Sequence, residues 1–91
     1  MLHIVKSVSA LSDLHPYLAE QDLVLLVEDA VYAANPQHKA HGLLNLPLTY
    51  VLNADADARA ITNRIGPALK RVDYAGFVEL TELELQSLTW D

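Results

Sequence analysis

The chain has 91 residues, a length that fits one small domain, residues 1–91. Hydrophobic residues make up 52% and charged residues 20%, a balance that excludes a disordered chain. Six Lys and Arg stand against twelve Asp and Glu, a net charge of -6, so we expect no direct binding of nucleic acid. No signal peptide or membrane-spanning stretch is evident, and we expect a soluble, cytoplasmic protein with no membrane partner.

Residues 2–5 and 22–27 are the first two predicted strands. The first is rich in β-branched residues. The second, Asp-Leu-Val-Leu-Leu-Val, has no polar alternation, which is typical of a strand covered on both faces in a parallel sheet. A buried helix is the alternative, but the run is short and bounded by acids. Between the two strands we expect a loop over residues 7–12, in which Ser9 or Ser12 caps a short helix.

Residues 28–34 predict a helix with Asp29 as its cap or in its first turn. Asn35-Pro36 ends this helix, because a residue before proline disfavours the α region. Residues 37–45 are expected to form a loop or an irregular helix. A third strand follows over residues 48–52, entered through Pro47.

The last part of the chain repeats the same alternation. Residues 54–62 are rich in alanine and predict a helix, residues 69–73 a short strand, and residues 74–81 another helix. The sequence leaves open whether the remaining tail forms a fifth strand. This order predicts a three-layer α/β/α domain with a mostly parallel sheet of four to five strands and right-handed crossovers.

Sites in such sheets form at the carboxyl ends of the strands. Four places are therefore candidates, namely Lys6-Ser7, Glu28-Asp29, Asn53 and Asp73-Tyr74. Glu28 and Asp29 are adjacent and point to opposite faces of a strand, which favours a capping or interface role over a catalytic pair.

No other motif indicates a catalytic or cofactor site. A phosphate-binding glycine loop is absent, and no serine lies in a Gly-x-Ser-x-Gly context. His38 and His41 have a spacing that shares a helix face, but without a third ligand we interpret them as a solvated pair rather than a metal site. His3, on the first strand, is interpreted as a packed residue. We expect no catalytic residue, no cofactor and no metal.

Cysteine is absent from the sequence. The chain therefore has no disulfide, no thiolate metal site and no thiol that could carry sulfur covalently. The apolar content is slightly high for so short a chain, which favours a protein–protein interface. We expect this interface to use the 28–34 segment, the aromatic residues of the last helix and the carboxyl-terminal segment, with the candidates Glu28, Asp29, Val31, Tyr32, Tyr74, Phe77 and Trp90.

The order of segments resembles the TusB/DsrH family over nearly the whole chain. The resemblance is carried by Met1-Leu2-His3, by Leu-Leu-Val-Glu-Asp-Ala-Val-Tyr-Ala-Ala at 25–34 and by Tyr-Val-Leu-Asn-Ala-Asp at 50–55. Residues 58–65, residues 72–81 and the tryptophan at 90 complete it. The resemblance implies a DsrE-like α/β/α fold and membership of a sulfur-relay complex.

In the tRNA-modifying branch of this family, TusB, TusC and TusD form a heterohexamer. A persulfide passes from TusA to a cysteine of TusD and on to TusE, for 2-thiouridine formation at the wobble position of tRNA. Some members of the sulfur-oxidising branch, which forms DsrEFH complexes, carry a cysteine in the first helix. This chain has none, which favours the tRNA branch.

Three functions are therefore compared. The first is a non-catalytic subunit of a TusBCD-type complex with TusC-like and TusD-like partners, which would form homo-oligomers when isolated. The second is a small ligand-binding domain or enzyme that uses Glu28, Asp29, Asn53 and Asp73. The third is a subunit of a DsrEFH-type sulfur-oxidation complex.

Overall fold

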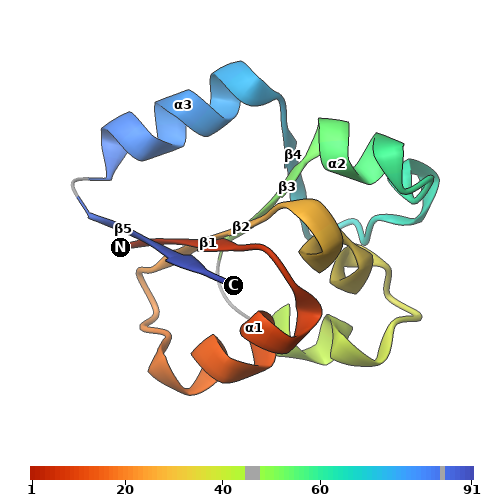
Figure 1. Ribbon diagram of the computed structural model, residues 1–91, viewed down its shortest axis with the longest axis horizontal. Coiled ribbons are helices and arrows are strands. Elements are labelled where there is room, and N and C mark those ends of the chain that lie inside the picture. The colour runs from red at the N-terminus through yellow and green to blue at the C-terminus, as the bar shows by residue number, and fades with distance from the viewer. Residues whose placement is uncertain (45–47, 85) are drawn as a thin grey trace.

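The computed structural model describes residues 1–44, 48–84 and 86–91. Its centre is a five-stranded sheet with the strand order β4-β3-β2-β1-β5, in which every neighbouring pair is parallel (Figure 1). The predicted three-layer fold with a parallel sheet is confirmed. The strands are β1 (Leu2–Val5), β2 (Leu23–Leu26), β3 (Thr49–Leu52), β4 (Lys70–Val72) and β5 (Ser87–Trp90).

Helical elements lie on both sides of the sheet, with α1 on one side and α3 on the other (Figure 1). The α-helices are α1 (Val8–Leu14), α2 (Asn53–Ala58) and α3 (Tyr74–Leu83). In the described part of the chain, four further segments are 3-10 helices, namely η1 (His15–Tyr17), η2 (Glu28–Ala34), η3 (Lys39–Leu44) and η4 (Thr62–Arg64). No helix within the described ranges has the length and apolar character needed to cross a membrane.

Strand β2 is buried on both faces of the sheet. Leu26 joins the larger apolar cluster, which contains residues of α1, η2 and η3. Its neighbour Leu25 joins the smaller cluster, which contains Leu80 of α3. Both leucines are 0% exposed. The strand predicted for residues 22–27 is confirmed, and its lack of polar alternation follows from this double coverage.

Helix α1 begins earlier than predicted, at Val8. Ser7 is extended, and its Oγ accepts a hydrogen bond from the Ala10 N–H at 3.1 Å. Ser7 therefore satisfies a free amide of the first turn, which is the role of an N-cap. The prediction of a loop over residues 7–12 with a cap at Ser9 or Ser12 is wrong, because both serines lie inside this helix.

The predicted helix over residues 28–34 exists as the 3-10 helix η2. Asp29 lies in its first turn, which is one of the two placements that the sequence predicted. The helix ends at Ala34, and Asn35 is its C-cap. The expected irregular helix after Pro36 is η3, whose described part ends at Leu44. Asn45, the end of that predicted segment, and Pro47, the predicted entry to β3, lie outside the described residues.

Helix α2 ends at Ala58, four residues short of the predicted end at residue 62. Ala60 adopts a left-handed conformation with φ 56°. Its N–H donates to the Asp57 carbonyl, and the Ile61 N–H donates to the Ala56 carbonyl, both at 3.1 Å. These two bonds form a Schellman motif, which closes a helix and usually has glycine at the left-handed position.

We expect Ala60→Gly to raise the free energy of unfolding by about 0.5–1 kcal/mol, because glycine adopts a positive φ without steric cost. Ala58→Gly is the matched control. It places glycine at an exposed position inside α2 and should destabilise by about the same amount. Urea denaturation followed by circular dichroism measures both changes. Equal destabilisation by the two variants would contradict the assignment of Ala60 as the helix stop.

After residue 81 the helix continues for two more residues, and a strand follows at Ser87. Helix α3 extends to Leu83 and is capped by Asp73, whose Oδ1 accepts the Gly76 N–H at 2.8 Å. Strand β5 then pairs in parallel with β1, with Leu2 opposite Ser87 and Val5 opposite Trp90. The sheet therefore has the fifth strand that the sequence left open.

Candidate functional site

A hollow lies at the carboxyl edge of the sheet, on the face covered by α3. Its volume is about 340 Å³. We call it the α3 hollow, and its lining residues are Ile4, Lys6, Val27, Glu28, Leu52, Asp55, Tyr74, Phe77 and Thr89. The structure thus brings together Lys6, Glu28 and Tyr74, which the topology of a parallel sheet predicted for this edge.

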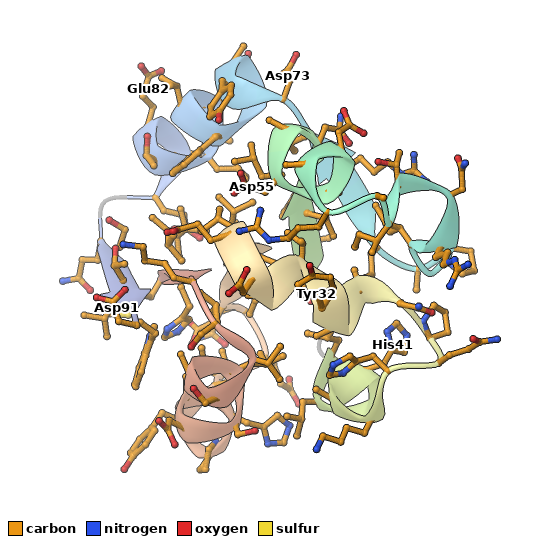
Figure 2. All side chains as sticks on the ribbon, turned by 45° about the vertical axis from the view of Figure 1, so that its right-hand side comes forward. Tyr32, His41, Asp55, Asp73, Glu82 and Asp91 are labelled. Carbon is orange, nitrogen blue, oxygen red and sulfur yellow. The ribbon has the colours of Figure 1, made fainter. Side chains whose placement is uncertain are left out.

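Glu28 has a strained backbone at the rim of the α3 hollow. Its φ is 47°, a conformation that a non-glycine residue adopts at some energetic cost. Asp55 holds it in place, since its Oδ2 accepts the Glu28 N–H at 2.6 Å. Figure 2 shows Asp55 beside η2, the helix that Glu28 begins. Strain of this kind concentrates at functional sites in proteins.

Lys6 connects two carboxylates at the same rim. Its Nζ lies 3.3 Å from Asp91 Oδ1 and 3.5 Å from Glu28 Oε2. The hydrogen bond to Asp91, with the negative charges of Asp91 and Glu28, raises the pKa of Lys6 above its ordinary value. Lys6 therefore stays protonated and is already partnered at neutral pH.

Asp29 and Tyr32 lie on η2 with exposed side chains, and Figure 2 labels Tyr32 on this helix. Arg59 Nε donates to Asp29 Oδ1 at 2.9 Å, and this bond raises the pKa of Arg59.

Val31, by contrast, is 0% exposed and belongs to the larger core cluster. Its prediction as an interface residue is wrong, because the side chain of Val31 points into the core, where a partner cannot reach it.

His3, Asp22 and Trp90 form a second polar group, on the opposite face of the sheet from the α3 hollow. His3 is 3% exposed, which confirms that it is a packed residue. Its Nε2 lies 3.0 Å from Asp22 Oδ2, and Trp90 Nε1 donates to His3 Nδ1 at 3.1 Å. An indole N–H only donates, so His3 Nδ1 accepts and Nε2–H donates to Asp22.

Asp22 accepts a further hydrogen bond, from the Ala19 N–H at 3.0 Å. This backbone bond, together with those from His3 and the amino group of Met1, lowers the pKa of Asp22 against the opposing effect of burial. The residue pairs in this group are 19 and 87 positions apart in the chain. No local pattern in the sequence predicted this group. The one feature that could have indicated it is Asp22, a carboxylate directly before a buried strand.

Four of the predicted interface residues divide between two hollows. Glu28, Tyr74 and Phe77 line the α3 hollow. Trp90 instead packs at the edge of the larger cluster, where its ring stacks on Tyr17 with centroids 6.3 Å apart. Tyr17, Trp90 and Leu88 line a second hollow of about 370 Å³ beside His3.

The remaining polar candidates have structural roles. Asp73 caps α3, and Asn53 begins α2. His38 accepts the Ala40 N–H at its Nδ1, and His41 Nδ1 donates to the Ala33 carbonyl. Both histidines are half-buried and each bonds to the backbone, so they are less exposed than the predicted solvated pair. Within residues 1–44, 48–84 and 86–91, no three His, Asp or Glu residues are grouped as metal ligands would be.

These features define a small α/β domain with a fully parallel sheet, no thiol, and polar groups that mostly have structural partners. A model of the family described as DsrH like protein matches residues 6–87. Relatives named Protein TusB, from Escherichia coli O81 and Escherichia fergusonii, are 36% identical and align over 99% of this chain and their entire length. A Protein TusB from Salmonella dublin is 36% identical over 80% of this chain and 79% of its own. The chain belongs to the DsrH-like family.

Proposed function

We propose that this chain is a non-catalytic subunit of a TusBCD-type sulfur-relay complex. In this role it supports 2-thiouridine formation at the wobble position of tRNA in the cytoplasm, in a heterohexamer with TusC-like and TusD-like subunits. Membership of the DsrH-like family and the full-length similarity to proteins named TusB support the proposal. The observation that carries it is the absence of cysteine.

A sulfur relay transfers a sulfane sulfur from one thiolate to the next. A chain without a thiol cannot hold this sulfur as a persulfide. Its contribution is therefore contact, which holds the cysteine-bearing subunits in place, and the charge that it adds to their surroundings. Two of the three carboxylates of the competing enzyme hypothesis already have structural roles, because Asp29 pairs with Arg59 and Asp73 caps α3. This use of the carboxylates favours the subunit over the enzyme.

We expect the purified chain to take up no labelled sulfur from a persulfide donor. When it is co-expressed with TusC-like and TusD-like chains of the same organism, it should co-purify with them, and the label should appear on the TusD-like chain. Intact-mass spectrometry of each subunit measures both results. A mass increase of one sulfur atom on the isolated chain would overturn the proposal.

A further inference from the structure

The smaller apolar cluster of the sheet is only partly covered. Helix α3 contributes Leu80 and Phe77 to this cluster, and Phe77 and Ile4 remain half-buried at the α3 hollow. Tyr74, one turn before Phe77, is 62% exposed at the mouth of the hollow. The hollow thus offers apolar surface to a further side chain, beside an aromatic residue that makes little contact with its own chain.

The rim of the α3 hollow carries an excess of negative charge. Lys6, Glu28 and Asp55 line the hollow, and Lys6 also contacts Asp91 just outside the lining. Arg59, which donates to the Asp55 carbonyl, is paired with Asp29. Two cations thus stand against four carboxylates, a net of two negative charges. Lys6 already contacts two of these carboxylates, so it neutralises them only in part. An apolar floor with an acidic rim is complementary to a segment that presents an apolar side chain next to a lysine or arginine.

We propose that the α3 hollow binds a basic segment of a cysteine-bearing subunit of the sulfur-relay complex. An aromatic or aliphatic side chain of this segment enters the hollow between Phe77 and Ile4, and an adjacent Lys or Arg pairs with Glu28 at the rim. This inference rests on the proposed function and names the surface and the partner chemistry through which the subunit assembles.

Charge also distinguishes this occupant from a second copy of the chain. Each copy carries a net charge of -6, so two copies would place acidic surfaces against each other at this rim, which opposes association. A basic segment of another chain removes that repulsion. The strained backbone of Glu28, fixed by Asp55, holds the main chain at the rim in one conformation before the partner arrives, which lowers the ordering cost of binding.

The test measures the affinity of this chain for the purified TusC-like and TusD-like subunits of the same organism, by biolayer interferometry. Tyr74→Glu adds a charge at the mouth of the hollow, and Glu28→Lys reverses one at its rim. Leu83→Glu is the matched control, because Leu83 lies on the same helix, is 77% exposed and does not line the hollow. All three positions are exposed, and circular dichroism melting verifies that each variant folds.

We expect Tyr74→Glu and Glu28→Lys each to weaken binding by about tenfold or more. Tyr74→Glu places a charge against the apolar side chain of the partner, and Glu28→Lys sets two like charges against each other. Leu83→Glu should change the affinity by less than about twofold, which is typical of positions outside an interface. Added salt should weaken binding by the wild type more than binding by Glu28→Lys. The wild type binds through an ion pair at Glu28 that salt screens, and the variant lacks this pair.

Two outcomes separate this inference from the proposed function. If the wild type binds the TusC-like or TusD-like subunit and all three variants bind equally well, assembly uses another surface and the inference fails, while the proposed function stands. If the wild type binds neither subunit, the proposed function itself fails. A homodimer of the wild type that Tyr74→Glu dissociates would also overturn the inference, because the occupant would then be a second copy.

Discussion

Asp22→Ala is expected to lower the free energy of unfolding by about 2–4 kcal/mol. The substitution leaves the His3 Nε2–H and the Ala19 N–H without the carboxylate that now accepts both hydrogen bonds. His3 is buried, and a buried donor that loses its partner is costly. Chemical denaturation measures the loss. Asp13→Ala, at an exposed position of α1, is the control and should change stability by less than about 0.5 kcal/mol.

The same carboxylate gives the stability a defined dependence on pH. Because the pKa of Asp22 is lower in the folded chain than its ordinary value of 3.8, its contribution is fully present above pH 3.8. The contribution is lost as the pH falls through the lowered folded value. The difference in stability between the wild type and Asp22→Asn should therefore shrink as the solution is acidified below pH 3.8. A difference that stays constant down to pH 2 would contradict the role of the charged carboxylate.

Leu25→Ala and Leu26→Ala are each expected to cost about 2–5 kcal/mol, the range for a large-to-small change in a packed core. The two side chains lie on opposite faces of β2, and each is fully buried. The contrast is with β5, at the edge of the sheet, where Leu88 is 45% exposed. Leu88→Ala should cost less than about 1 kcal/mol. Thermal or urea denaturation of the three variants measures the difference. If Leu25→Ala lowered the free energy of unfolding only slightly while Leu26→Ala lowered it as expected, the face of the sheet under α3 would not form a packed core.

The sequence was most informative where a whole element shared one environment. The run at residues 22–27 predicted a doubly covered strand because burial on both faces removes polar alternation. The alternation of strands and helices then predicted a parallel sheet. This topology placed Lys6, Glu28 and Tyr74 at one edge, where the α3 hollow now brings them together.

Local detail depended on single residues and on contacts between distant parts of the chain. Any of three nearby serines could cap α1. Ser7 is the cap because a helix that begins after it buries Ala10, Leu11 and Leu14. The left-handed residue that closes α2 is Ala60 and not glycine, so the sequence does not mark the end of this helix. A prediction from helix propensity alone therefore made the helix too long. The burial of Val31 depends on how η2 faces α1 and the sheet. The contact of Trp90 with His3 needed the position of β5.

The pairing of β1 with β5 has a consequence for how the molecule folds. Leu2 and Ser87 face each other across this pair, so the chain must close a loop over almost its whole length to form it. Until then β1 presents an open row of amide and carbonyl groups, a surface on which another chain can add as a strand. Folding should be slow for so short a domain, and the greatest risk of aggregation falls in the interval before this last strand docks.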